Sequence, residues 1–179
     1  AECNGARMNK VIWWIRRDLR LADNQPLIEA MKRSEEIIPL FILDPFFSKN
    51  DQHTPRAAFL YAGLNDLAES LQRIGSRLII RRGKPQEVLT KLTSESSIDG
   101  IFAEADFSWY ARKRDGKVAK ALPLQLVGSP SFRHPTDVLK ADETPYTVFT
   151  PYMKAWKMRC LPGRSDLIQA PQHINTPLD

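Results

Sequence analysis

Five short apolar segments, rich in β-branched and aromatic residues, alternate with amphipathic segments along this chain. Because such runs show no polar alternation, they predict strands that are covered on both faces. Strands that alternate with helices favour an α/β fold, a parallel sheet with helices on both faces. Since crossovers are right-handed, few arrangements remain, and we predict a doubly wound sheet of order 3-2-1-4-5. The predicted strands are 11–15, 37–43, 78–80, 101–105 and 124–127.

Helical periodicity is clearest at 60–74, where leucines recur at steps of four and three and Gly75 provides a stop. Pro26 and Pro85 suit the first position of two further helices. Ser108 is a suitable N-cap for a basic helix that reaches Leu122. Pro39 interrupts the second strand run and predicts a strand start or a weakly paired position.

The chain of 179 residues is long enough for one domain with a short tail. We predict an α/β domain over 10–135 and a C-terminal extension over 136–160 that ends in a short helix. Residues 161–179 contain three prolines and no apolar period, which predicts a linker to a further domain.

Composition narrows the class of protein. The net charge of +5 and pI near 9.3 permit an anionic partner without requiring one. No apolar run is long enough for a membrane span or an export signal, so we expect a cytoplasmic protein. Two cysteines near opposite ends predict reduced thiols, and three scattered histidines predict no metal site. These residues are Cys3, Cys160, His53, His134 and His173.

Open parallel sheets bind ligands beyond the carboxyl ends of the strands, where the winding reverses. The predicted crevice lies between strands one and four, bordered by loops 16–20 and 106–109, with 44–45 beside them. Arginines, carboxylates and aromatic side chains in these loops suit a flat heteroaromatic ligand. No glycine-rich phosphate loop and no nucleophile–histidine arrangement accompanies them, so we expect no catalytic residues in this chain.

Other interpretations of the charged residues remain open. Asp18 would equally well bridge the neighbouring arginines as contact a ligand. The basic run at 112–114 is more often a solvated helix face than a nucleic-acid contact. Direct nucleic-acid binding through 112–120 is therefore a third hypothesis, beside a ligand-binding domain of a larger enzyme and a stand-alone nucleotide- or flavin-binding module.

The segment WIRRDLRLADN at 14–24 resembles the opening signature of the DNA photolyase and cryptochrome family. Further pieces match that family in order, so the resemblance covers about residues 10–158. These pieces are FILDP at 41–45, RAAFL at 56–60, Gly75, Gly83, Asp106, Tyr110, Arg114, Asp115, PYTVFTPY at 145–152, Lys154 and Trp156.

The resemblance implies a function. In the family this region is the N-terminal domain that carries a light-harvesting antenna pigment, while FAD and the pocket for damaged DNA belong to a helical domain further along. It implies a fragment of a photolyase, a monomer that repairs pyrimidine dimers in DNA with light and that is inactive when reduced to this segment. Cryptochrome, a photoreceptor, is the alternative, because repair and signalling diverge outside this segment.

The resemblance also implies site residues. Folate-binding members carry an asparagine–glutamate pair where this chain has Tyr110 and Ala111, so an FMN or 8-hydroxy-deazaflavin pigment is favoured over folate, or else an empty site. Trp109 replaces the proline usual there and would cover the pigment pocket or fill it. The expected antenna-site residues are Arg17, Asp18, Leu19, Ile42, Leu43, Asp44, Arg56, Asp106, Phe107 and Trp109.

Overall fold

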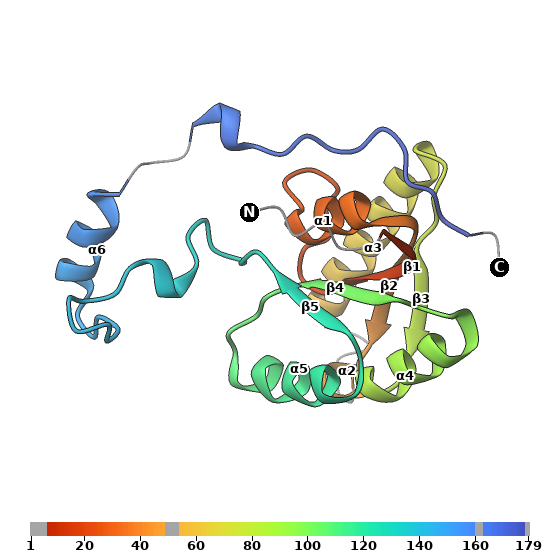
Figure 1. Cartoon of the computed structure of the whole chain (residues 1–179), viewed down its shortest axis with the longest axis horizontal. Helices are drawn as coiled ribbons and strands as arrows, with labels where there is room; N and C mark the ends of the chain where they lie inside the picture. Colours follow the sequence, from red (N-terminus) through yellow and green to blue (C-terminus); the bar gives the residue numbers. More distant parts are fainter. Residues whose placement is uncertain (1–6, 49–53, 160–162, 178–179) are drawn as a thin grey trace.

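A computed structural model describes residues 7–48, 54–159 and 163–177. Its centre is a five-stranded, all-parallel sheet of order β3-β2-β1-β4-β5, which confirms the predicted doubly wound fold (Figure 1). The strands are β1 (Met8–Ile15), β2 (Ser34–Leu43), β3 (Ile79–Arg82), β4 (Gly100–Glu104) and β5 (Leu124–Val127). The helices are α1 (Gln25–Arg33), α2 (Pro45–Ser48), α3 (Pro55–Arg73), α4 (Pro85–Ser96), α5 (Trp109–Ala121) and α6 (Phe149–Lys157).

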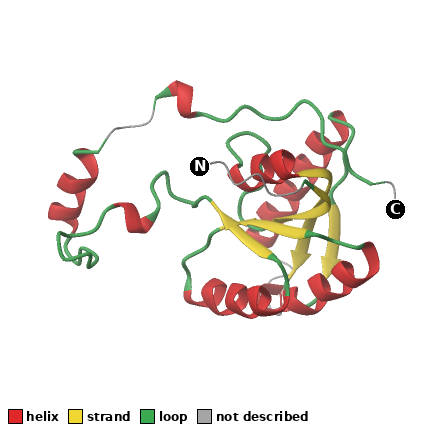
Figure 2. Ribbon diagram, in the orientation of Figure 1, coloured by secondary structure: helices red, strands yellow, loops and turns green. Residues whose placement is uncertain are grey.

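The central strand β1 explains why the sheet needs cover on both faces. Val11, Trp13 and Ile15 pack into the core on one face of the sheet, together with residues of α1 and α3. Ile12 and Trp14 pack into a second core on the other face, with residues of α4 and α5. Because successive side chains of a strand point to opposite faces, an uninterrupted apolar run feeds both cores. Figure 2 shows the resulting helix–sheet–helix layers.

Local signals set the ends of the helices. Thr54 caps α3 by accepting from the backbone N–H of Ala57 at 3.2 Å, so this helix begins at Pro55, before the predicted start at residue 60. Gly75, with φ of +77°, follows its C-terminus as predicted. Ser108 caps α5 through the N–H of Ala111 at 3.3 Å, also as predicted.

Pro39 lies inside β2, which is an internal strand of the sheet. It is opposite Trp13 of β1, whereas the ladder from β2 to β3 begins one residue later at Leu40. Pro39 therefore occupies a position where β2 has one strand neighbour rather than two. The expectation of a weakly paired position is confirmed, and the missing N–H is tolerated there.

Beyond β5 the chain leaves the sheet. A 3₁₀ turn at Pro135–Asp137 and helix α6 extend away from the layered body, and a second 3₁₀ turn follows at Arg164–Asp166. The chain then runs back over α1 toward the side of β3 (Figure 1). Within the described residues, no helix is long and apolar enough to cross a bilayer.

The returning segment is held against the body of the protein. Ile174 is 1% exposed and belongs to the same core as Ile37. The backbone N–H of Ile37 donates to the carbonyl of Asn175 at 2.8 Å, and Ser76 and Thr176 share a hydroxyl hydrogen bond of 2.6 Å. The sequence predicts a linker over 161–179, and the structure adds an anchor within its described part that no periodicity indicates.

The anchor yields a stability prediction. Ile174→Ala removes a fully buried side chain, so the free energy of unfolding should fall by about 2–5 kcal/mol. Leu167→Ala is the control, because Leu167 is exposed and its truncation should change stability by less than about 0.5 kcal/mol. Urea denaturation followed by circular dichroism measures both. Equal effects of the two substitutions would contradict the anchoring role of Ile174.

Candidate functional site

An ion pair underlies the carboxyl end of the central strands. Arg16 follows β1 directly, and its Nη1 donates to both carboxylate oxygens of Asp115 in α5, at 2.8 Å each. Its Nη2 donates to the backbone carbonyl of Glu104 at the end of β4. Both side chains of the pair are more than nine-tenths buried. One guanidinium therefore links β1, β4 and α5 at the point where the winding of the sheet reverses.

Two arginines flank the indole of Trp14. The guanidinium carbons of Arg16 and Arg114 lie 4.8 and 4.9 Å from its ring centroid. Asp115 also accepts from Nε of Arg114 at 2.8 Å, so a single carboxylate serves both cations. Burial and the charge of Arg114 lower the pKa of Arg16, while Asp115 acts against them. Arg16, Arg114 and Asp115 thus form one charged, hydrogen-bonded cluster that packs against Trp14.

Asp18 organises the loop between β1 and α1. It is 1% exposed and accepts from the backbone N–H of Arg16 at 3.2 Å and from Nδ2 of Asn24 at 3.0 Å. The other amide atom of Asn24 caps α1 by accepting from the N–H of Leu27 at 3.0 Å. Burial raises the pKa of Asp18, although these hydrogen bonds oppose the rise. Its carboxylate therefore holds the loop through a backbone N–H and an asparagine amide, and not through the arginine side chains that the alternative interpretation named.

Arg17 and Asp106 meet across the reversal point. Arg17 Nη1 lies 3.6 Å from an oxygen of Asp106, and the arginine side chain is 65% exposed. Burial acts to raise the pKa of Asp106, but hydrogen bonds from Ser108 and the charge of Arg17 outweigh it and hold the pKa below its usual value. The pair offers one cation and one anion side by side at an accessible edge.

Glu104 at the end of β4 is a second, more enclosed carboxylate. It is 8% exposed, and its Oε1 lies 3.9 Å from Nη2 of Arg20. Burial raises the pKa of Glu104, and the charge of Asp18 raises it further, against the effect of Arg20.

Asp44, after β2, is occupied by a neighbour that the sequence did not suggest. The hydroxyl of Tyr110 donates to one carboxylate oxygen of Asp44, and the backbone N–H of Phe46 donates to the other at 2.9 Å. The rings of Phe46 and Tyr110 stack with centroids 3.9 Å apart. Burial and the Asp44 charge raise the pKa of Tyr110, so its hydroxyl remains a proton donor.

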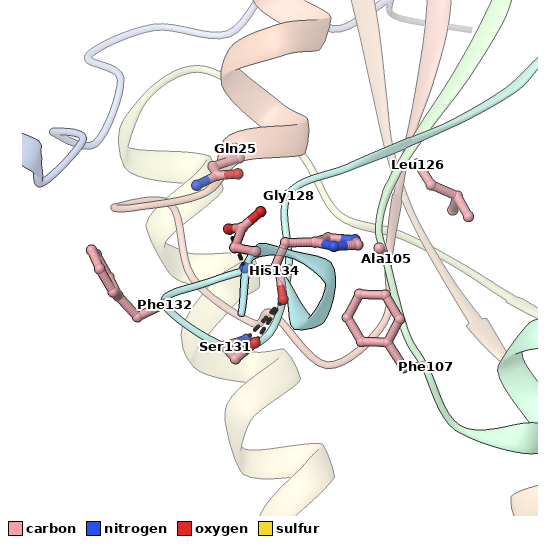
Figure 3. A pocket seen from close by; sticks show the side chains of 10 residues that line it. Gln25, Ala105, Phe107, Leu126, Gly128, Ser131, Phe132 and His134 are labelled. Atoms are coloured by element: carbon pink, nitrogen blue, oxygen red, sulfur yellow. Dashed lines mark hydrogen bonds between the residues drawn. The ribbon is translucent and has the colours of Figure 1, made fainter. Parts of the chain in front are cut away.

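A cavity of about 450 Å³ lies beyond the ends of β4 and β5. Figure 3 shows Phe107 and His134 beside each other at its wall, with Gln25 of α1 on the far side. The rings of Phe107 and His134 meet edge to face at 4.9 Å. The volume falls within the range of small-molecule sites. Ala105 and Phe107, the chain neighbours of Asp106, line the cavity, whereas the side chains of Asp106 and Arg17 do not.

The structure does not gather all ten expected residues into one wall. Ile42 is buried in the core on the α4 and α5 side, and Leu19 packs against α3 at a position where Gly63 leaves space. Arg56 is exposed on the first turn of α3, and no described carboxylate pairs with it. Trp109 is 73% exposed and turns toward Lys113. The residues brought together at the accessible edge are Arg17, Asp106 and Phe107.

Sequence reasoning missed Gln25, His134 and the Tyr110–Asp44 contact. The sequence offered one signal for this cavity, because Gly128 directly follows a predicted strand, where ligand-lining turns are common. In the structure the φ of Gly128 is +73°. Cys3, Cys160 and His53 lie outside the described residues. Among those described, no three histidine, cysteine or carboxylate side chains are placed to hold a metal ion.

Comparison with known proteins identifies the family. The model of the family described as DNA photolyase matches residues 11–173, so the chain belongs to that family. A deoxyribodipyrimidine photo-lyase from Synechococcus sp. is 33% identical over 158 residues, which cover 85% of this chain and 33% of that protein. Cryptochromes DASH are also among the relatives.

Solved structures agree on the fold. A class III photolyase from Agrobacterium tumefaciens superposes with a TM-score of 0.84 at 23% identity, over 99% of this chain and 37% of that chain. A photolyase from Sulfolobus tokodaii, described with two FAD molecules and a novel light-harvesting cofactor, gives 0.74 at 22% identity, over 94% and 38%. This chain thus spans little more than a third of these proteins.

The buried ion pair yields a stability prediction. Asp115→Ala leaves two buried guanidinium groups without their shared carboxylate, so unfolding free energy should fall by about 3–5 kcal/mol. Asp142→Ala removes an exposed carboxylate and should leave the unfolding free energy close to that of the wild type. Urea titrations of both variants decide the matter, and a small loss in Asp115→Ala would show that the pair is dispensable.

Glu104 yields a pH prediction. Because its pKa is raised on folding, the native state binds its proton more tightly than the unfolded state does. From pH 4.5 upward, the wild-type protein should therefore lose stability relative to Glu104→Gln, which cannot ionise. Unfolding free energies of both proteins at several pH values up to neutrality measure the difference. A difference that is constant or grows in favour of the wild type contradicts the raised pKa.

Proposed function

We propose that this chain is the N-terminal light-harvesting domain of a deoxyribodipyrimidine photolyase, and that an antenna pigment binds at the carboxyl edge of its sheet. The observation that carries the proposal is the Arg17–Asp106 pair at the reversal point, in a chain of the photolyase family whose residues Ala105 and Phe107 line a 450 Å³ cavity. Ligands of doubly wound sheets bind at this point.

The residues at the edge suit such a pigment. Asp106 can accept a hydrogen bond from a ring N–H, and Arg17, being largely exposed, can turn toward a carbonyl or phosphate oxygen. Phe107 offers a flat apolar surface at the cavity wall. When bound, the pigment would absorb light and pass the excitation energy to FAD. This chain's own residues would hold and orient the pigment, and none of them would make or break a bond.

A flavin or deazaflavin pigment fits better than folate. At the two positions where folate-binding relatives carry a hydrogen-bonding pair, Ala111 is buried without a polar side chain, and the hydroxyl of Tyr110 already donates to Asp44. A pterin placed there would bury donors without acceptors, at a cost of about 1–3 kcal/mol each. We therefore propose FMN or an 8-hydroxy-deazaflavin as the pigment.

The remaining activity belongs to the longer protein. We propose that a further helical domain binds FAD and DNA with pyrimidine dimers, that residues 161–179 lead to it, and that the protein is a cytoplasmic monomer. A cryptochrome is the second candidate, because cryptochromes DASH are among the relatives. Light-dependent repair of a thymine-dimer oligonucleotide by the full-length protein separates the two, since a photoreceptor without repair activity leaves the dimer intact.

The pigment site yields a binding prediction. Arg17→Ala and Asp106→Asn each remove one charge from the edge, so each should weaken FMN binding by roughly tenfold, the loss of one charge-assisted hydrogen bond. Arg56→Ala tests whether the site reaches α3. Titration of this chain against FMN, followed by the fluorescence of the flavin, measures the affinities.

Two exposed positions supply the matched controls. Arg112→Ala and Asp142→Asn remove the same charges at exposed positions that do not line the cavity, and they should leave FMN affinity unchanged. Wild-type affinity in both Arg17→Ala and Asp106→Asn would overturn the proposed site. Tighter binding of a methenylated folate than of FMN would overturn the assignment of the pigment.

A further inference from the structure

The exposed side of α5 carries positive charge without a balancing negative charge. The helix packs on the sheet through Ala111 and Val118, on the face opposite α1 and α3 (Figure 1). Its exposed side holds four cations with a glycine among them. We call this set the basic face of α5 and define it by Arg112, Lys113, Gly116, Lys117 and Lys120.

The other long helices of the sheet domain balance their exposed charges. Each of α1, α3 and α4 contains a carboxylate and a cation four residues apart, close enough to pair. Such pairs stabilise a helix surface. They are Glu29–Arg33 at 2.6 Å, Glu69–Arg73 at 3.2 Å and Lys91–Glu95 at 3.8 Å.

The basic face lacks any such pair. Asp115 is the acidic residue of α5, and it is buried against the two arginines of the ion cluster. None of the four cations of the face forms an ion pair with a described carboxylate. Lys113 and Lys117 are four residues apart, a spacing at which like charges destabilise a helix. The stability of α5 therefore does not explain this charge pattern, which favours contact with an anionic partner.

Gly116 lies at the centre of the basic face. Arg112 and Lys113 lie one turn before it, Lys120 lies one turn after it, and Lys117 is its chain neighbour. A Cβ at this position would have nothing within 4 Å, so packing inside the chain does not require glycine here. Glycine weakens a helix relative to alanine, but it lets a partner come close to the backbone. A rigid anionic partner could thus reach all four cations at once.

The basic face is elongated along the helix. Arg112 and Lys120 are eight residues apart, which corresponds to about 12 Å along the helix axis. On one strand of duplex DNA a phosphate recurs about every 3.4 Å of the axis, so this length meets about three phosphates. A regular line of phosphates can contact cations along the whole face, whereas a single small anion would contact one end of it.

We propose that the basic face of α5 binds the phosphate backbone of double-stranded DNA. The sequence left nucleic-acid contact through 112–120 open, and the structure supports it by placing unpaired cations around an exposed glycine on one side of α5. Contacts to phosphates carry no sequence information, so the face binds duplex DNA with or without a lesion. It is separate from the pigment site and from the dimer pocket that we propose for a further domain.

Fluorescence anisotropy of this chain with a fluorescein-labelled, undamaged duplex of about 20 base pairs tests the proposal. The expected dissociation constant is about 10⁻⁴–10⁻⁶ M at physiological salt, and the affinity should fall as salt is raised. The corresponding single strand and vesicles containing phosphatidylserine are compared at equal phosphate concentration. Tighter binding of either competitor than of the duplex overturns the proposal, and so does absence of duplex binding at about 50 mM salt.

Variants locate the contact on α5. The double variant Lys113→Ala/Lys117→Ala should reduce the salt slope of duplex binding by about 1.8, because each phosphate contact contributes about 0.9. Gly116→Glu places a carboxylate among the cations and should bind about tenfold more weakly than Gly116→Gln, which has the same size without the charge. These positions are exposed, so circular dichroism should show an unchanged fold.

Lys32→Ala/Arg73→Ala is the matched control. It lowers the net charge by the same amount at exposed positions of α1 and α3, which cover the opposite face of the sheet. The control should leave the salt slope unchanged. Equal reductions in the two double variants would assign binding to net charge alone and overturn the proposal, as would equal affinities of Gly116→Glu and Gly116→Gln.

The outcome is independent of the pigment site. The duplex contains no pyrimidine dimer, and the titration needs neither pigment nor light. Failure of the chain to bind the duplex overturns the DNA contact of α5 alone, whereas the pigment site is tested by FMN titration. Arg17→Ala, which should weaken FMN binding, should leave the salt slope of duplex binding unchanged.

Discussion

The buried ion pair between Arg16 and Asp115 determines how the carboxyl edge of this sheet is built. It joins β1, β4 and α5 where the winding of the sheet reverses. Arg16 and Arg114, which share the Asp115 carboxylate, both pack against the ring of Trp14. Buried charges are stable only when they are paired and hydrogen-bonded, and here one carboxylate satisfies two guanidinium groups. The loop positions above this pair are consequently fixed before any ligand arrives.

Charged residues at this edge therefore divide into two groups. Arg16, Asp18 and Asp115 are buried and hold the backbone in place. Arg17 and Asp106 are more accessible and leave atoms that a ligand can contact. The same division occurs among the aromatic side chains, since Trp14 is core whereas Trp109 is exposed beside lysines. A residue's type alone gives no means of separating the two groups.

Periodicity predicted the strands and their order because an apolar run of five residues can be buried only between two layers of helices. Local residue preferences predicted the starts of α1, α4 and α5, because Pro26 and Pro85 occupy the first turn of their helices and Ser108 is an N-cap. Periodicity added no information there. Periodicity did not predict the beginning of α3, because the first turns of this helix are largely exposed. It also did not predict the burial of Ile174, which is a single apolar residue among polar neighbours. Burial of one residue by distant segments leaves no periodic signal.

The sequence by itself determined the layered sheet, the edge for which we propose ligand binding and the family signature at 14–24, because these depend on local pattern and chain order. Tertiary structure alone decided that Asp44 accepts a hydrogen bond from Tyr110, that Arg17 pairs with Asp106, and that Trp109 is exposed beside Lys113. Such contacts join residues from different loops, and their geometry follows from the register of the strands and the packing of α5, which no spacing along the chain encodes.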